Sequence, residues 1–580
     1  MRFWSTRNGS AWWRPLDAEA GTWRVSVNAL DLPDGDGAAR RIMVDTGEDK
    51  QPLLALAEHL PVPVPDSDLV LLTGDGFVRA APRRGVLVTE SVDLQQATVR
   101  LAGTVVGTPP AGVALVGPRA RTHVVPVEAT GTSWRAELPL RATPLSGGEP
   151  LPLSRDDYRV DAGDDHVVFA APGLVPGAQA GRAAEPEWRP LRLEGGGLVV
   201  ARGRADEVET HTRHGQRTLQ AGPYVAVRSQ ARRPVVLFDS FVGRGGWHGA
   251  AAVARAFAAA RPDLELAWST RDESLPVPPG TTPVLRQSAE WFDRLGAASH
   301  VVTNGTMPRF YEKAPGQRLV QLWTGTPVLR FGRAVRVAEE GGASDVRALD
   351  RDVAQWDALY TGGPVGTAWM REATGFGGEV HEVGHPALDA YATDRAARRA
   401  AVRRLLGLGD GPVLLYAPTT RQAVRAHTRR EKIAHFDRDL VAEVPGLTVL
   451  HRGHPTSANR ATLVEPGVLD VTLYPELSDL VLAADAVVTD YSALLVDVLA
   501  SDTPLGLLVP DRDDFEERGL FPDLFDVPPG PVAETTEDLV PWLTGGLATS
   551  YDGRARLRAE LLPLDDGHAA ERVAARELDR

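Results

Sequence analysis

The stretch A-D-A-V-V-T-D-Y-S-A-L-L-V-D-V-L-A-S-D-T-P at residues 484–504 decides the fold of this chain. Its apolar run at 486–488 has the length of a buried parallel strand. Ser492 follows in a polar turn and can cap a helix, because Leu and Val then recur at helical spacing. The stretch therefore predicts a strand, a turn and a helix, which is the unit of an open α/β sheet whose ligands bind at such turns.

The same alternation of strand and helix signals runs from Pro234 to the end of the chain. Such alternation is typical of parallel sheets covered by helices on both faces. The signals fall into two sets that separate near residues 385–410. We therefore expect two Rossmann-like domains that face each other, with the active site between them.

Residues 1 to about 230 have a different pattern, in which short alternating runs such as W-R-V-S-V at 23–27 lie between Gly, Pro and Asp clusters. This pattern is typical of β-sandwiches. The words G-T-W-R-V at 21–25 and G-T-S-W-R-A at 131–136 form a faint repeat, which favours related β modules with a boundary near residue 97. The expected divisions are a β module at 1–97, one or more sandwich-like β modules at 98–230, and two Rossmann-like domains at 231–400 and 401–580.

Composition excludes several classes of protein. A formal net charge of −14 argues against general nucleic-acid binding. The absence of Cys excludes disulfides, thiolate metal sites and Cys nucleophiles, and it fits a cytoplasmic protein. No H-E-x-x-H motif is present, so we expect neither a metal nor another cofactor. No apolar run reaches the length of a membrane span, and the N-terminus lacks the apolar core of a signal peptide.

The basic run at 395–404 leaves a peripheral contact with the inner face of the cell membrane open. A solvated helix face explains the run equally well.

Several short words occur in a fixed order along the second half of the chain. They are Q-L-W-T-G-T-P at 321–327, Y-A-P-T-T-R at 416–421, R-G-H-P at 452–455, T-D-Y-S at 489–492, S-D-T-P at 501–504 and E-R-G-L-F at 517–521. Over about residues 234–545 this ordered set resembles the CDP-glycerol glycerophosphotransferase family, the teichoic acid polymerases and primases. The resemblance implies a GT-B fold of two Rossmann-like domains. It also implies CDP-glycerol or a related CDP-polyol as donor, and a polymer or lipid-linked glycan as acceptor.

The chain departs from the family at one position. The family's word usually reads W-H-G-T-P, and that His is the proposed base for the acceptor hydroxyl, whereas Thr324 occupies the position here. A Thr hydroxyl can hydrogen-bond a substrate, but it cannot hold a proton near neutral pH as an imidazole can. By family position, Asp239 and His248 are the nearest substitutes. A different base, a different donor or acceptor, and weak or absent activity all stay open.

The candidates for the donor side are His454, Arg421, Thr419, Glu476, Asp490, Ser492 and Arg518. His454 resembles the family's second functional His, which could stabilise charge on the leaving cytidylate. The guanidinium groups of Arg421 and Arg518 match phosphate oxygens. Glu476 could accept a hydrogen bond from a ribose hydroxyl, and Asp490 could orient its neighbours. Solvated loops, surface ion pairs and first-turn helix charges are the structural alternatives.

The resemblance predicts a transferase that moves glycerol phosphate, or a related polyol phosphate, from a CDP-activated donor to a hydroxyl of a teichoic acid or capsule polymer. The acceptor oxygen attacks phosphorus in line and CMP leaves. One alternative is a GT-B glycosyltransferase that uses a nucleotide sugar. Another is a degenerate polymer-binding protein whose β modules hold a glycan.

Overall fold

The computed structural model describes the chain in pieces up to residue 203 and in longer segments after it. The described residues are 17–19, 22–24, 40–41, 43–45, 50–52, 62–63, 69–74, 77–82, 85–95, 97–117, 122–163, 166–171, 174, 188–192, 197–203, 212–335, 342–419, 444–453 and 467–579. The chain forms two compact units, which are Met1–Ala142 with Pro152–Ala205, and Thr143–Leu151 with Asp206–Arg580.

The best-described part of the first unit is a pair of five-stranded sheets. Their orders are β13-β14-β10-β9-β18 and β12-β11-β17-β20-β19. The strands are β9 (Gly85–Leu94), β10 (Thr98–Gly107), β11 (Gly112–Val116), β12 (Val125–Pro126), β13 (Glu128–Thr130), β14 (Ser133–Pro139), β17 (Asp157–Asp161), β18 (His166–Ala170), β19 (Trp188–Arg192) and β20 (Leu198–Arg202). Every second residue of β14 is buried, which is the period of a strand with one face on a core. Trp134 and Trp188 are buried in that core.

Shorter strands precede this pair of sheets in sequence, and two more lie between β14 and β17. They are β1 (Asp17–Glu19), β2 (Thr22–Arg24), β3 (Arg40–Arg41), β4 (Met43–Asp45), β5 (Lys50–Pro52), β6 (Val62–Pro63), β7 (Leu69–Gly74), β8 (Phe77–Pro82), β15 (Arg141–Ala142) and β16 (Leu151–Pro152). The module boundary that we predicted near residue 97 falls in the turn between β9 and β10, which are antiparallel neighbours in one sheet.

The second unit begins with a seven-stranded parallel sheet in the order β23-β22-β21-β24-β25-β26-β27. Its strands are β21 (Arg233–Asp239), β22 (Glu265–Thr270), β23 (Thr282–Leu285), β24 (Ala298–Thr303), β25 (Arg318–Gln321), β26 (Ala358–Thr361) and β27 (Glu379–Glu382). Its helices are α2 (Arg213–Leu219), α3 (Val225–Arg228), α4 (His248–Ala260), α5 (Ala289–Ala297), α6 (Gly342–Val353) and α7 (Pro364–Thr374). Apolar clusters bury both faces of this sheet, as parallel sheets require.

A six-stranded parallel sheet follows in the order β30-β29-β28-β31-β32-β33. Its strands are β28 (Val413–Tyr416), β29 (Thr448–His451), β30 (Val468–Asp470), β31 (Ala486–Thr489), β32 (Leu505–Leu508) and β33 (Val532–Ala533). Its helices are α8 (Arg395–Leu405), α10 (Leu477–Ala483), α11 (Leu494–Ala500), α12 (Arg512–Arg518) and α13 (Asp552–Leu561). The predicted strand, turn and helix at 484–504 are therefore β31, its following turn and α11.

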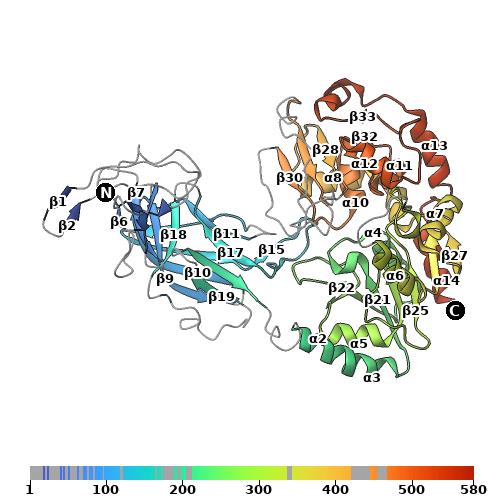
Figure 1. The fold of residues 1–580 in the computed structure, drawn as a ribbon, viewed down its shortest axis with the longest axis horizontal. Coiled ribbons are helices and arrows are strands. Elements are labelled where there is room, and N and C mark those ends of the chain that lie inside the picture. The colour runs from blue at the N-terminus through green and yellow to red at the C-terminus, as the bar shows by residue number, and fades with distance from the viewer. Residues whose placement is uncertain are drawn as a thin grey trace. The chain divides into compact units, whose positions relative to one another are not determined.

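Both sheets share one topology. Numbered within its own domain, each sheet runs 3-2-1-4-5-6, and the first sheet adds one more strand at its end. This is the doubly wound order, and it places a ligand crevice where the strand order reverses, beside the first and fourth strands. The described α/β part of the chain is thus a GT-B-like fold (Figure 1).

The last helix, α14 (Ala569–Leu578), returns to the first of these two domains. Glu577 is 1% exposed and forms an ion pair with Arg318 of β25, at 2.7 Å between Oε2 and Nε. The Tyr360 hydroxyl of β26 donates to the same carboxylate at 2.6 Å. The helix therefore ties the end of the chain to the first sheet, beside which it lies in Figure 1.

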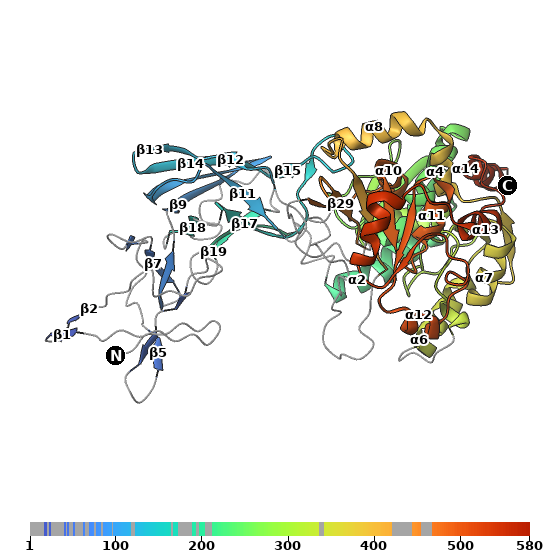
Figure 2. The ribbon, with the colours of Figure 1, turned by 90° about the horizontal axis from the view of Figure 1, so that it is seen from above.

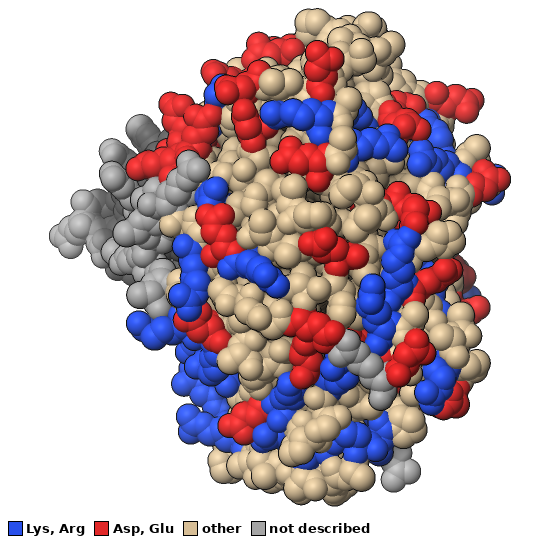
Figure 3. Space-filling view, turned by 90° about the vertical axis from the view of Figure 1, so that its right-hand side faces the viewer, with Lys and Arg blue, Asp and Glu red and all other residues tan. Residues whose placement is uncertain are grey.

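The basic run at 395–404 lies on α8, which packs beside α10 (Figure 2). Its ion pairs are Arg395–Asp502, Arg398–Asp479, Arg399–Asp485 and Arg403–Asp485. On the face of the molecule in Figure 3, basic and acidic side chains are likewise interspersed. Among the described residues, no helix is both long enough and apolar enough to cross a bilayer.

Candidate functional site

Backbone strain marks the loops that leave the first sheet. Among the described non-glycine residues, positive φ values occur at Phe241 (46°), Val242 (58°), His248 (45°), Trp323 (50°) and Gln287 (71°). The first three follow β21, and Trp323 follows β25. Bulky residues rarely adopt this conformation, and it costs on the order of 1–3 kcal/mol at each position. Such strain gathers at functional sites, and here the first three residues follow the first strand of the doubly wound order, which borders its ligand crevice, whereas Trp323 follows the fifth strand.

His248 connects the two Rossmann-like domains. Its Nε2 lies 3.2 Å from Asp497 Oδ1 on α11, although 249 residues separate them in sequence. Beside it, the amide of Trp247 donates to the carbonyl of Pro475 at 3.0 Å. Both His248 and Asp497 are nearly buried, with 12% and 11% of their side chains exposed. The loop after β21 and the helices after β30 and β31 therefore meet at this point.

The charges around His248 compensate for its burial. Burial by itself lowers the pKa of His248, but the charge of Asp497 and the hydrogen bond to it outweigh this and raise the pKa above its usual value. Burial, reinforced by the charge of Asp479, raises the pKa of Glu476. Burial also lowers the pKa of Arg452 to about 10, although the charges of Glu476 and Asp497 oppose this. The group is a buried cluster of mixed charge in which the carboxylates stabilise the protonated form of His248 against the effect of burial.

Asp239, the other proposed substitute base, lies at the end of β21 and is 2% exposed. Its Oδ2 accepts from Arg286 Nε at 3.3 Å and from Nη2 at 3.2 Å. A buried guanidinium in this position stabilises the carboxylate by its charge. The structure therefore engages Asp239 in a buried ion pair with Arg286.

In the second domain, Asp490 forms hydrogen bonds with the loop after β28 and with the turn after β31. Its Oδ1 accepts from the Thr419 hydroxyl at 2.6 Å, and its carboxylate also accepts from the Thr419 amide and from the Ser492 amide at 3.1 Å. The single hydroxyl proton of Thr419 is thus used within the protein. Ser492 Oγ accepts from the Leu494 amide at 3.3 Å, at the start of α11.

Three donor-side predictions cannot be placed. Arg421 and His454 lie outside the described residues, and so does the side chain of Arg518. Glu476 immediately precedes α10, is 6% exposed and accepts from the Ser478 hydroxyl at 3.3 Å. Of the predicted residues, the structure brings Thr419, Asp490 and Ser492 into one hydrogen-bonded group. Glu476 lies near His248, whose charge lowers the pKa of this carboxyl, although burial raises that pKa overall.

A pocket lies beside the strained loop after β25. It is lined by His248, Gly249, Leu322, Trp323, Gly325, Thr326, Tyr360, Thr361, Gly362, Gly366, Met370, Gly384, His385, Pro386 and Ala387. Thr324 is half-buried and is not among these residues. The residues of the T-G-T-P word that face the pocket are Gly325 and Thr326.

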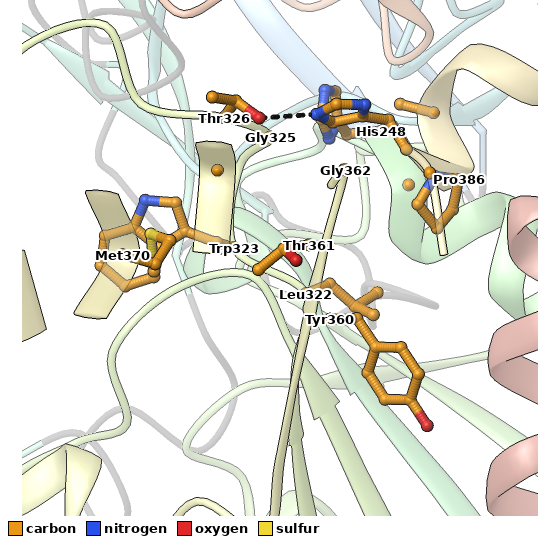
Figure 4. Close-up of a pocket in the computed structure, with 15 residues that line it drawn as sticks. His248, Leu322, Trp323, Gly325, Thr326, Tyr360, Thr361, Gly362, Met370 and Pro386 are labelled. Carbon is orange, nitrogen blue, oxygen red and sulfur yellow. Dashed lines mark hydrogen bonds between the residues drawn. The ribbon is translucent and has the colours of Figure 1, made fainter. Parts of the chain in front are cut away.

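One hydrogen-bonded chain in this pocket joins a hydroxyl, an imidazole and a carboxylate. Thr326 Oγ1 lies 2.8 Å from His385 Nε2, and this is the bond that Figure 4 draws as a dashed line from the labelled Thr326 to an unlabelled ring. His385 Nδ1 lies 3.0 Å from Asp565 Oδ2. The backbone amide of His385 donates to Asp565 Oδ1 at 2.7 Å. Thr326, His385 and Asp565 are therefore held in the order that activates hydroxyl groups in many enzymes.

Two glycines leave the space that His385 occupies. A Cβ on Gly362 would lie 1.8 Å from His385 Cε1, so only a glycine allows the ring to pack there. Gly384 has a φ of 86°, and a Cβ on it would lie 2.8 Å from the carbonyl oxygen of Leu564. The imidazole of His385 can therefore lie in its present position only because residue 362 has no side chain.

One sequence pattern points to His385 as a candidate site residue. His385 lies in a G-H-P word at 384–386 that repeats the G-H-P of 453–455. Asp565 carries no local signal, because it approaches His385 only after the chain returns to the first domain ahead of α14. Within the described residues, no three His, Asp or Glu side chains are placed to hold a metal ion.

Residues 224–577 match the family described as CDP-Glycerol:Poly(glycerophosphate) glycerophosphotransferase. The teichoic acid poly(glycerol phosphate) polymerase of Staphylococcus epidermidis is 27% identical over 313 residues, 51% of this chain and 43% of that protein. The teichoic acid glycerol-phosphate transferase of Staphylococcus aureus is 26% identical over 306 residues, 50% of this chain and 78% of that protein.

The poly(glycerol phosphate) polymerase of Bacillus subtilis is 26% identical, and the match spans 44% of its length. The chain therefore spans less than half the length of two of these relatives. A solved structure of the wall teichoic acid polymerase TagF superimposes with a TM-score of 0.56 at 23% identity, over 64% of this chain and 95% of that one. This similarity confirms the GT-B-like fold.

Proposed function

Because the chain belongs to the CDP-glycerol:poly(glycerophosphate) glycerophosphotransferase family, we propose that it transfers glycerol phosphate from CDP-glycerol to a hydroxyl of a teichoic acid chain. A related CDP-polyol is the wider class of donor, and a capsule polymer or lipid-linked glycan is the wider class of acceptor. One of the solved TagF structures was soaked with CDPG, which supports a CDP-linked donor.

The observation that carries the proposal is the contact between His248 and Asp497. The family match spans both Rossmann-like domains, and this contact joins a loop of the first domain to a helix of the second. A transferase needs its acceptor and its donor at one point, so the meeting of these elements supports a reaction between the two domains.

We assign the acceptor to residues 231–400 and the donor to residues 401–580. On the donor side, Arg421, Arg518 and Ser492 are proposed to bind the diphosphate, His454 to stabilise the leaving CMP, and Glu476 to accept from the ribose. Asp490 and Thr419 hold the loops that carry these groups, which agrees with their hydrogen bonds to each other. The acceptor oxygen attacks phosphorus in line as the bond to CMP breaks.

Residues 213–228, which the sequence pattern placed with the β modules, contain the helices α2 and α3 of the second unit. We therefore propose that the part of the chain before residue 206 consists of sandwich-like β modules that contact the polymer. The described sheets support the sandwich-like architecture, because Trp134 and Trp188 are buried in the core that the two sheets share. Peripheral contact with the inner face of the membrane, from a cytoplasmic position, belongs to the same proposal. It would bring the enzyme to a lipid-linked acceptor.

Calorimetry with CDP-glycerol, CDP-ribitol and UDP-sugars tests the donor class, and release of CMP in the presence of a glycerol phosphate-primed acceptor tests the reaction. The proposal expects CDP-linked donors to bind and CMP to be released. Binding of UDP-sugars alone would instead support a GT-B glycosyltransferase. Binding of CDP-linked donors without turnover would support the polymer-binding alternative, which Thr324 favours.

A further inference from the structure

We propose that His385 is the general base for the acceptor hydroxyl, acting through Thr326 and oriented by Asp565, and that it replaces the imidazole this chain lacks at position 324. The inference rests on the proposed function, and it names which residues of the acceptor side move the proton. It differs from the substitutes suggested by family position, which were Asp239 and His248.

The hydrogen bonds determine which nitrogen of His385 carries the proton. Asp565 accepts at Nδ1, with 3.0 Å to Oδ2 and 3.3 Å to Oδ1, so Nδ1 is the N–H donor in the neutral ring. Nε2 then carries the lone pair and accepts from the Thr326 hydroxyl at 2.8 Å. This is the tautomer that a base requires, and the carboxylate stabilises the imidazolium that forms when the base takes a proton.

The position of His385 also fits the departure at Thr324. A Cβ placed on Gly325, the next residue, would lie 4.0 Å from His385 Cδ2 and 3.9 Å from His248 Cε1. Two imidazoles therefore border the loop that contains position 324, where the family usually has its His. Thr326 is 3% exposed and His385 6%, so bulk water has little access to the pair. A base at this point would act in a shielded pocket.

The two imidazoles are not equivalent. Nε2 of His248 is committed to Asp497 across the domain interface, and Glu476 lies close enough to act on it by charge. Asp497 occupies Nε2 of His248, and its charge raises the pKa of this ring despite burial, so this nitrogen is not presented to a hydroxyl. His385 instead presents its acceptor nitrogen to a hydroxyl that lines a pocket.

Other charged groups surround the far side of His385. Asp389 accepts from the amides of Ala569 and Ala570. Burial raises the pKa of Asp389, and the charges of Asp565 and Asp566 add to this increase. Arg572 donates to the Val383 carbonyl at 2.8 Å and forms an ion pair with Asp566. Asp565 is the carboxylate that contacts the ring itself, so its substitution tests the orientation of the base.

The proposed step conserves protons and electron pairs. The acceptor oxygen forms a bond to the phosphorus that carries glycerol, and the bond from that phosphorus to the bridging oxygen of CMP breaks. The electron pair of the broken bond leaves with CMP. The acceptor's proton passes to Thr326 Oγ1 as the Thr326 proton passes to His385 Nε2, and the imidazolium later loses a proton to solvent.

The test measures CMP release and calorimetric CDP affinity for full-length His385→Asn, Thr326→Val, Thr326→Ser and Asp565→Asn. His385→Asn and Thr326→Val should lower kcat by about 10²- to 10⁴-fold, the usual contribution of a base, while CDP affinity is retained. Thr326→Ser keeps the hydroxyl and should keep most of the rate. Asp565→Asn should lower kcat and change the limb of the pH–rate profile that falls toward low pH, which a merely structural carboxylate would not do.

His214→Asn is the matched control, because His214 is exposed on α2. If His385→Asn keeps kcat within a few-fold of wild type, or if Thr326→Val and Thr326→Ser behave alike, the inference is wrong while the proposed function stands. Retained CDP affinity shows that a slow variant is folded. If the wild-type chain turns over none of the CDP-linked donors, the proposed function and this inference fail together.

Discussion

His248 and His385 both lie close to Gly325, and they come from different parts of the first domain. His248 begins α4 and reaches across to Asp497 of the second domain. His385 follows β27 and stays within a pocket with Thr326 and Asp565. The difference teaches that one imidazole serves the contact between the domains, whereas the other is free to accept a proton from a hydroxyl group.

The largest expected effect comes from displacing His385 without altering it. Gly362→Ala places a Cβ only 1.8 Å from the present position of His385 Cε1, so the imidazole ring must move away from Thr326. We expect kcat for CMP release to fall by about 10²-fold or more. Gly377→Ala is the control, because a Cβ there meets nothing within 4 Å. Equal rates for the two variants would place the base elsewhere.

A smaller effect is expected from returning the imidazole to the family's position. In the His385→Asn background, Thr324→His should raise kcat by about 10-fold or more, the lower end of acid–base contributions. In the wild-type background the same change should add little, since a base is already present. The added volume must fit a half-buried position, so CDP affinity is measured alongside. An increase in wild type equal to that in the variant would show that His385 was not serving as base.

His248→Asn should act mainly on stability. Removing one partner of a nearly buried hydrogen bond to a carboxylate costs about 1–3 kcal/mol in the free energy of unfolding. The folded-state pKa of His248 is raised, so its contribution is complete below the unfolded value of about 6.5 and is lost as pH rises through the higher folded value. Denaturant unfolding of wild type and variant should therefore differ most at pH 5–6 and least at high pH. A difference that grows with pH would contradict the ion pair.

The smallest effect is expected from removing the β region. Both imidazoles and all donor-side candidates belong to the second compact unit. A fragment of residues 206–580 should therefore bind CDP about as tightly as the full chain in calorimetry. A folded fragment with lost CDP affinity would show that the first unit contributes to the nucleotide site.

The fold of the larger unit could be predicted because its signals are local. Apolar runs such as 486–488 and the helical spacing after Ser492 depend on neighbours in the sequence, and they became β31 and α11. The doubly wound order of both sheets could not be derived from those runs, because pairing between strands far apart leaves no local pattern. The predicted module boundary near residue 97 rests on local composition, which does not reveal that β9 and β10, on either side of it, pair in one sheet.

The candidate site was predictable in part. The resemblance directed attention to Thr324 and His248, and His248 does lie at the meeting of the domains. It gave no reason to consider His385, because the partners of this residue are 59 and 180 positions away in sequence. Asp239 is the opposite case. Its position in the sequence made it a candidate base, but in the structure its carboxylate accepts a hydrogen bond from Arg286.

The most direct test of the account is the rate of the chemical step in a single turnover, with the CDP-glycerol complex mixed with acceptor and CMP formation followed in time. The account predicts that His385→Asn slows this step by about 10²-fold or more. His248→Asn should slow it much less. A chemical step that is slower in His248→Asn than in His385→Asn would reverse the two roles and contradict the account.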